Sequence, residues 1–273
     1  PYLPPRQTLA FTRKLLDDLA AAGGNFSRFW LSDWWNGLEW SESLDNYSGL
    51  GRYNLKNAWL NDQILAACEE RGIYLQLETL NHVRLGHRYG WPVHPYRLIN
   101  GGFLESPNDF WGHPQTLAYS RRRLAYIIAR YADSPAIHSW NIMSEPDMAA
   151  TGAWRPAKPY ILTQIRTFQE LDPYHHITGN QTCLPDCDVG FFRLPEVQFV
   201  NANAYPDIGG LSRDQIPAIR DFALRYSQHG RPMSVAECGG HWAGDPLFKI
   251  RRDTVGALWS GVTSGLAGTP LSW

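Results

Sequence analysis

The sequence predicts an α/β fold in which parallel strands curl into a (β/α)8 barrel. Short apolar runs alternate with amphipathic helices from one end of the chain to the other, and this alternation is typical of parallel strands joined by right-handed crossovers. The chain carries no GxGxxG motif after its first strand, no GxxxxGK[ST] motif and no GxSxG motif. The open-sheet nucleotide-binding and serine-hydrolase folds therefore lose their main signatures, and a barrel is favoured.

The predicted elements follow one another without a break in composition, a repeat or a linker. Apolar runs predict seven strands, at 26–32, 73–80, 136–145, 176–181, 197–205, 231–238 and from about 269 onward. Apolar residues at helical spacing predict helices within 8–22, 60–71, 124–131, 161–171, 216–226 and 247–262. The stretch 81–115 shows no clear period, so we expect a long loop over the barrel mouth, where loops are usually functional.

Length and charge exclude several classes of protein. A chain of 273 residues can bury a core without a disulfide or a metal ion. With 25 Lys and Arg against 26 Asp and Glu, the net charge of −1 gives no field that would gather nucleic acid or anionic lipid, so we expect neither nucleic acid nor membrane as a partner. The four cysteines form neither a disulfide framework nor a paired zinc motif; Cys183 and Cys187 are either a loop disulfide or two free thiols.

The frequency of tryptophan is the unusual feature of the composition. The chain has 12 Trp among 36 aromatic residues (with 13 Tyr and 11 Phe), more than a core of this size needs, and flat rings with a polar edge suit stacking on sugars. Trp34, Trp35 and Trp40 follow the first predicted strand, and Trp91 and Trp111 lie in the 81–115 stretch. We interpret them as walls of a substrate cleft, with a packing role as the alternative for each.

Two glutamates stand at the ends of buried strands. Glu145 ends the run WNIMSE, and Glu237 ends the run MSVAE. In a parallel barrel both carboxyl groups project at the mouth, where burial and charged neighbours shift carboxyl pKa values. Two carboxylates about 5–5.5 Å apart cleave a glycosidic bond with retention, and a gap of about 6.5–9.5 Å gives inversion. The alternative is that one or both only cap a helix or pair with an arginine.

The chain resembles the clan-A glycoside hydrolases, and most closely glycoside hydrolase family 5. The similarity spans nearly the whole length and rests on NFSRFWL (25–31), the run from GRYN to LNH (51–82), WNIMSEPD (140–147), NANAYP (201–206), RPMSVAECGG (231–240) and GLAGTPLSW (265–273). The resemblance implies a (β/α)8 barrel that hydrolyses β-linked glucans or mannans by a retaining double displacement without a cofactor. Glu145 would be the acid/base and Glu237 the nucleophile.

The resemblance assigns further roles one position at a time. Arg28 would hydrogen-bond the nucleophile, His82 would face the sugar in the −1 subsite, and Tyr205 would orient the nucleophile. Trp273 would form the floor of that subsite, and Asn81 would add a polar contact.

The chain departs from the family at two positions of this subsite. Ser144 stands where the family usually has an asparagine before the acid/base, and Asn203 stands where it has the histidine of His-x-Tyr. These departures are the only hints of an alternative function, a carbohydrate-binding pseudoenzyme on the same barrel.

The same resemblance predicts that the chain is a fragment. The family's first strand should precede the helix at 8–22, but PYLPPRQ contains no apolar run, and the chain stops at Trp273. We therefore expect one barrel domain over 1–273 that is completed by another segment, with further domains of the same polypeptide as possible partners. A secreted or periplasmic location is expected, although PYLPPRQTLAF at the start of the sequence does not resemble a signal sequence.

A metal-dependent barrel hydrolase is the remaining rival. His82, His87, His94 and Asp147 could supply ligands, but no HxH or HExxH spacing places two of them on one element. The sequence therefore predicts no metal site.

Overall fold

The computed structural model describes residues 5–86, 90–149, 154–206, 208–239 and 245–272. Within these ranges each predicted helix is present, as α1 (Pro5–Ala21), α2 (Leu55–Glu69), α3 (Pro114–Tyr131), α4 (Trp154–Leu171), α5 (Gln215–Tyr226) and α6 (Leu247–Thr263). Six of the predicted strands are also present, as β1 (Phe26–Trp30), β2 (Tyr74–Glu78), β3 (Ile137–Asn141), β4 (Ile177–Gly179), β5 (Val200–Ala204) and β6 (Met233–Cys238). The seventh is reduced to a bridge between Ser272 and Cys238.

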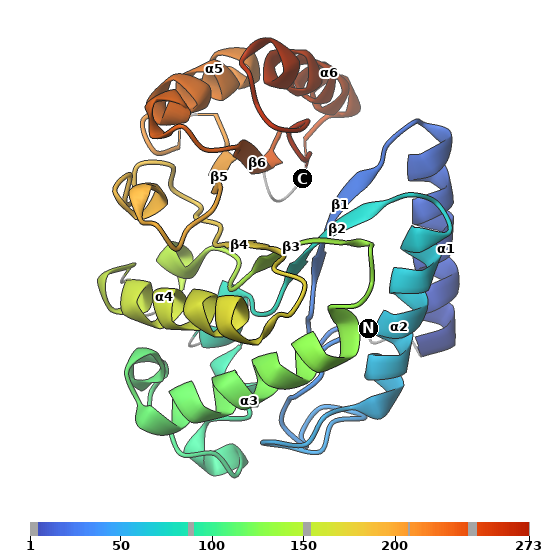
Figure 1. The fold of residues 1–273 in the computed structure, drawn as a ribbon, viewed down its shortest axis with the longest axis vertical. Coiled ribbons are helices and arrows are strands. Elements are labelled where there is room, and N and C mark those ends of the chain that lie inside the picture. The colour runs from blue at the N-terminus through green and yellow to red at the C-terminus, as the bar shows by residue number, and fades with distance from the viewer. Residues whose placement is uncertain (1–4, 87–89, 150–153, 207, 240–244, 273) are drawn as a thin grey trace.

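The strands run parallel in sequence order and form the inner layer, with the helices outside them (Figure 1). β1 to β4 form one sheet, β5 and β6 form a second, and a bridge between Thr182 and Ala202 joins the two. The order is that of a (β/α)8 barrel, in which each strand pairs with the next and helices cover the outside.

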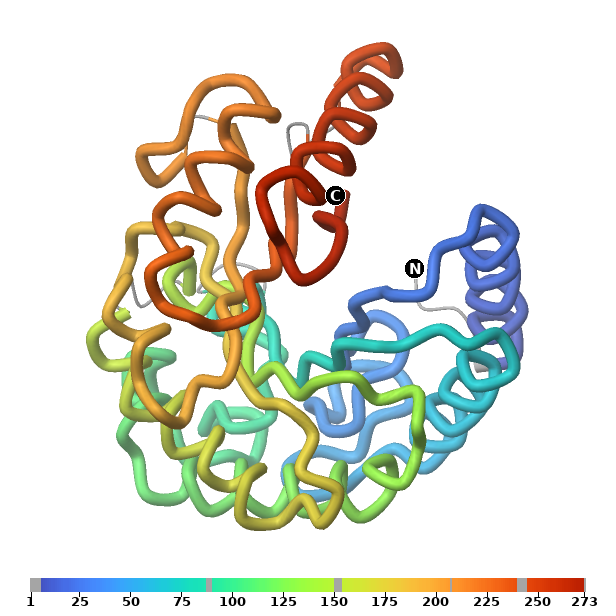
Figure 2. Tube along the Cα trace, turned by 45° about the horizontal axis from the view of Figure 1, so that its top comes forward, coloured from blue at the N-terminus to red at the C-terminus, as the bar shows by residue number. Residues whose placement is uncertain are grey.

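The barrel is open on one side. Figure 2 shows the trace as an arc whose C-terminal segment and β1–α1 segment face each other across the opening. Among the described residues no strand precedes α1, as the sequence led us to expect. That the chain is a fragment of a longer polypeptide stays a prediction.

The two faces of the sheet differ in polarity. Phe29, Leu75, Leu77 and Trp140 are buried on the face that packs against the helices. The opposite face, inside the barrel, carries buried polar side chains, namely Arg28, Gln76, Glu78, Ser139, Asn141, Asn201 and Asn203. A barrel interior is ordinarily filled with branched apolar side chains. The polar interior is costly unless its groups are paired, and it brings charged groups to the centre of this barrel.

The 81–115 stretch is a packed layer of short 3₁₀ turns, which include η1 (His82–Leu85) and η4 (Pro107–Trp111). The fully buried imidazole of His94 lies at its centre, stacked on Trp91 and edge-on to Phe110. Trp91 and Trp111 are only 5% and 4% exposed, so the expectation that they line a substrate cleft is wrong. Their rings pack the layer, Trp111 against Tyr160 of α4, because these large apolar faces bury more area there than at a wet cleft wall.

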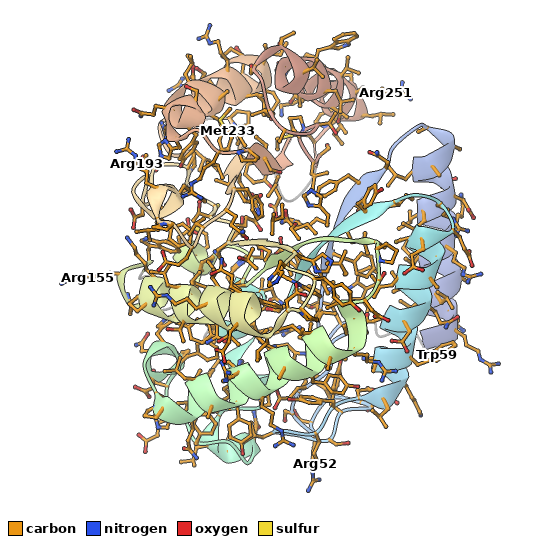
Figure 3. All side chains as sticks on the ribbon, viewed as in Figure 1. Arg52, Trp59, Arg155, Arg193, Met233 and Arg251 are labelled. Carbon is orange, nitrogen blue, oxygen red and sulfur yellow. The ribbon has the colours of Figure 1, made fainter. Side chains whose placement is uncertain are left out.

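The outer surface carries arginines together with exposed apolar side chains, such as Phe248 and Trp259 of α6. Figure 3 shows Arg52, Arg155 and Arg251 projecting from the periphery of the ribbon. None of the helices in the described parts of the chain has the length and apolar character that crossing a membrane requires.

Candidate active site

Glu237, near the end of β6, is the centre of a converging set of donors. One carboxylate oxygen accepts the Nη2–H of Arg28 and the Nε2–H of Gln181, the latter at 3.2 Å. The other accepts the hydroxyl of Tyr205 at 2.7 Å and the Nδ2–H of Asn203 at 3.2 Å. Four donors from three segments of the chain therefore hold this carboxylate in one orientation.

Glu145 lies just past β3, in a backbone conformation that few residues adopt. Its φ of 49° and ψ of 53° place it in the left-handed region, directly before Pro146. Such a conformation costs about 1–3 kcal/mol in a residue with a Cβ, and it persists where the surroundings enforce it, often at functional sites. The strained turn aims the carboxylate at the Nδ2–H of Asn203, 2.5 Å away, and places it 3.2 Å from Nδ1 of His82.

Asn203 joins the two glutamates. Its Nδ2 lies 2.5 Å from one oxygen of Glu145 and 3.2 Å from one oxygen of Glu237. Those two oxygens can therefore be no farther apart than the sum of the two distances. That limit, which applies to one oxygen of each carboxyl group, is near the separation of about 5–5.5 Å found in retaining glycosidases.

Burial and charge separate the two carboxyl groups chemically. Burial, and then the neighbouring charge of Glu237, raise the pKa of Glu145 to about 8, so this carboxyl is protonated at neutral pH. Burial lowers the pKa of His82, so its imidazole is neutral beside it. Burial and Glu237 raise the pKa of Tyr205 well above its ordinary value, which keeps the phenol a hydrogen-bond donor. The site thus holds one protonated and one donor-bound carboxyl group, the arrangement of an acid and a nucleophile.

The raised pKa of Glu145 predicts a loss of stability in mild alkali. A carboxyl whose pKa is about 8 when folded and 4.5 as its reference value binds an extra proton only in the folded state. The stability this gives is complete below pH 4.5 and is lost as the pH rises to 8, by on the order of 5 kcal/mol. We expect the Tm of wild type to fall, relative to that of Glu145→Gln, by several degrees between pH 5 and 8.5 in circular-dichroism melts. A constant difference would contradict the prediction.

The remaining predicted residues divide into neighbours of the site and residues away from it. Asn81 and Ser144 form a bridge between the segments that follow β2 and β3, and the backbone N–H of His82 donates to the carbonyl of Ser144. Trp34 is 40% exposed beside the guanidinium of Arg84, whereas Trp35 packs on Phe29.

Two predicted tryptophans remain. Trp40 is buried against His94, so its interpretation as a cleft residue is wrong for the same reason as for Trp91. Trp273 lies outside the described residues.

Three residues at this site were not found from the sequence. Gln181 follows β4 and donates to Asn203 and Glu237; Cys183, a free thiol, lies within hydrogen-bond reach of Glu145; and Glu78 on β2 contacts Arg28. The resemblance assigned a role to none of them, although Glu78 lies within the run 51–82. The only available signal is position, since each lies at or just after the end of a strand whose neighbours point into the barrel.

The residues considered as metal ligands make other contacts in the structure. Asp147 accepts the backbone N–H groups of Cys183 and Leu184, at 2.9 and 2.8 Å, and so ties the loop after β4 to that of Glu145. His94 lies in the aromatic layer, where burial lowers its pKa to about 3. His87 lies outside the described residues. In the part of the chain that the structure describes, no three His, Cys, Asp or Glu side chains gather as a metal ion would require.

No family model matches the chain. Among curated proteins, the chain is 26% identical over 171 residues to a probable mannan endo-1,4-beta-mannosidase C of Aspergillus terreus. This match covers 54% of the chain but only 41% of that protein, so the chain spans less than half the length of the relative.

Solved structures show the same fold at low identity. The endo-beta-1,4-mannanase of Thermotoga petrophila superposes with a TM-score of 0.73 at 16% identity, over 100% of this chain and 66% of that one. A glycoside hydrolase family 5 mannosidase from Rhizomucor miehei superposes with a TM-score of 0.66 at 13% identity, over 96% of this chain and 74% of that one. The predicted barrel class is confirmed, and so is the resemblance to family 5 of the clan-A glycoside hydrolases.

Proposed function

We propose that the chain carries the active site of a retaining glycoside hydrolase that cleaves β-linked glycans. Glu145 is the acid/base and Glu237 the nucleophile. The observation that carries the proposal is the single amide nitrogen of Asn203 that lies within hydrogen-bond distance of both carboxylates. It keeps one oxygen of each carboxylate close to the other, which supports a separation short enough for one to attack the carbon whose bond the other protonates.

The reaction takes two displacements. The protonated carboxyl of Glu145 gives its proton to the glycosidic oxygen while Glu237 attacks the anomeric carbon, so the leaving sugar departs as an alcohol and a glycosyl-enzyme forms. Glu145, now a carboxylate, takes a proton from water, whose oxygen attacks the same carbon and releases Glu237. Two inversions give net retention.

The donors around Glu237 serve both steps. Arg28 and Tyr205 stabilise the negative charge of the free nucleophile and of the nucleophile as it leaves in the second step. The neutral imidazole of His82 lies 3.2 Å from Glu145 and its side chain is 20% exposed, so a sugar hydroxyl in the site could reach the ring.

Mannan is the substrate class we propose first. Both the sequence relative in Aspergillus terreus and the solved structure from Thermotoga petrophila bear the name of an endo-acting β-mannan hydrolase. β-Glucans are the second class, because the two departures at Ser144 and Asn203 lie where the sugar ring is recognised. A polysaccharide of either kind does not cross a membrane. A secreted or periplasmic location therefore fits this function.

The test combines substrates with a covalent trap. The purified protein is assayed on β-mannans, β-glucans, xylan and aryl β-glycosides, with and without excess EDTA. It is then incubated with an activated 2-deoxy-2-fluoro glycoside of the best substrate class, and the labelled peptide is identified by mass spectrometry. We expect EDTA-insensitive hydrolysis and a label on Glu237. Binding of glycans without hydrolysis or label would instead indicate a carbohydrate-binding pseudoenzyme.

Asn203 offers a separate prediction, because it is the donor that both carboxylates share. Asn203→Ala should lower kcat/KM by about 10- to 100-fold, the loss expected when a hydrogen bond to a charged group is removed at a reaction centre. Initial rates on the best substrate measure the effect.

A neighbour on the same strand provides the matched control. Asn201 has the same side chain and the same burial inside the barrel, and its Nδ2 lies 3.4 Å from the side-chain oxygen of Asn141, with no hydrogen bond to either glutamate among the described residues. Asn201→Ala should change kcat/KM by less than about threefold. Equal losses in the two variants would mean that Asn203 acts only through the fold.

A further inference from the structure

A third carboxyl group lies behind the two glutamates. Glu78, the last residue of β2, is completely buried, and its Oε1 lies 3.4 Å from Nε of Arg28 and 3.4 Å from Nε2 of Gln76. Its Oε2 is buried with no hydrogen-bond partner among the described residues. A buried carboxyl is costly unless it is paired, and an amide would fill the same space. The presence of a carboxyl group at this buried position is therefore explained by its contact with Arg28.

Arg28 is shared between two carboxyl groups. Nε–H and Nη2–H lie along one edge of a guanidinium, the edge that can grip a single carboxylate with two parallel hydrogen bonds. Here the edge is divided, because Nε faces Glu78 and Nη2 donates to Glu237. Nη1 is buried without a hydrogen-bond partner in the described part of the chain. Glu78 thus decides which part of the guanidinium reaches Glu237.

We propose that Glu78 is a positioning residue. Because Glu78 holds Nε of Arg28, Glu237 receives one N–H group from this arginine and not a bidentate pair of hydrogen bonds. The inference rests on the proposed function, in which Glu237 is the nucleophile. A carboxylate that accepts both N–H groups loses two charge-assisted hydrogen bonds as its negative charge passes into the new bond to the anomeric carbon. It therefore attacks more slowly.

The charge of Glu78 changes in the neutral pH range. Burial raises its pKa to about 7, against the lowering effect of Arg28 and with a further rise from Glu237. Arg28 comes from β1 and Glu237 from β6; the other side chains that face Glu78, those of Gln76 and Asn141, carry no charge. The hold on Arg28 should therefore tighten as the pH rises through 7.

Two variants test the geometry and the charge separately. Glu78→Leu removes the acceptor, and Glu78→Gln keeps an acceptor oxygen of the same shape without the charge. We expect Glu78→Leu to lower kcat about 10-fold with KM within about twofold, and Glu78→Gln to lower it less. The pH profile of wild type should bend near pH 7, and that bend should be absent from both variants.

The matched control is another buried carboxylate. Asp172, which accepts the indole N–H of Trp140 at 2.8 Å, is equally shielded but has no contact with Arg28 among the described residues. Asp172→Asn should lower Tm and leave kcat and the pH profile unchanged. Wild-type kcat in Glu78→Leu would overturn the inference. If Glu78→Leu does not fold, Glu78→Gln decides. A wild-type kcat in Glu78→Gln, together with a retained bend near pH 7 in its pH profile, would also overturn the inference.

A measurement without substrate separates this inference from the proposed function. In ¹⁵N-labelled protein, the Nε–H resonance of Arg28 should shift with a midpoint near pH 7 in wild type and stay constant in Glu78→Gln. A wild-type resonance that does not move between pH 6 and 8 would overturn the inference, even in an active enzyme. Absence of hydrolysis and of label in wild type would overturn the proposed function, and the resonance would still decide whether Glu78 holds Arg28.

Discussion

Glu237→Ala is expected to lower kcat/KM by about 10⁵-fold, the largest effect of any single substitution in this chain. The variant loses the atom that forms the covalent bond, so neither displacement can take place. Arg28 keeps Glu78 as a partner, and Tyr205 lies near the surface of the site, so the fold should persist. Initial rates on the best substrate, with circular-dichroism melts beside them, measure the effect.

Azide distinguishes loss of the nucleophile from a general loss of structure. In Glu237→Ala the shortened side chain leaves room for azide to attack the anomeric carbon directly, which inverts it and gives the α-glycosyl azide from an activated β-glycoside. Glu170→Ala is the control for an exposed glutamate, since its ion pair with Arg121 is on the surface and contributes little. Wild-type activity in Glu237→Ala, or a β-glycosyl azide as its product, would remove Glu237 from the role of nucleophile.

The order of the elements could be predicted from the sequence because apolar periodicity reports burial directly. The starts of two helices could not. α3 begins at Pro114 and α4 at Trp154, each well before its apolar stripe, because the first turns carry polar residues and proline that hide the period. The side chain of His113 accepts the backbone N–H of Gln115 and so provides the cap that starts α3.

The site was predicted in two ways. The carboxylates at the strand ends were predicted from their position and residue type, and Arg28, His82 and Tyr205 from the family resemblance. The structure brings these five side chains together.

The predictions based on aromatic composition failed in part. The exposure of a tryptophan depends on packing that no count of rings can report, and Trp91 and Trp111 are buried. Glu78 was missed because its direction follows from strand register, in which Arg28 pairs with Gln76 and Trp30 with Glu78. A residue two positions from Gln76 shares its face, and only the register shows that this face lies inside the barrel beside Arg28.

The polar interior and the catalytic pair are one electrostatic system. Glu78, Glu237 and Glu145 place three carboxyl groups around one buried arginine, and all three cannot carry a full charge without a large cost. At neutral pH this group of carboxyls therefore keeps a proton on Glu145, whose pKa is about 8. Holding the acid in its protonated form at neutral pH is therefore a consequence of how many carboxyl groups the barrel buries beside Arg28.

Glu145→Ala is the second large effect, and its size should depend on the leaving group. On a glycan, whose leaving sugar needs a proton, kcat/KM should fall by about 10²- to 10⁴-fold. On a dinitrophenyl glycoside, whose leaving group needs none, formation of the glycosyl-enzyme should be nearly unchanged and its hydrolysis should become slow. Pre-steady-state bursts of dinitrophenol measure the two steps separately. The alkaline limb of the wild-type profile, near pH 8, should disappear in the variant.

Azide again fixes the role, with the opposite stereochemistry. In Glu145→Ala it attacks the glycosyl-enzyme from the face that water uses, so two inversions give the β-glycosyl azide and turnover rises. Glu170→Ala is again the control, because this exposed carboxyl pairs with Arg121 on the surface and its loss should leave the burst unchanged. An equal loss on glycan and dinitrophenyl glycoside in Glu145→Ala would mean that this carboxyl supports the structure of the site and does not donate the proton.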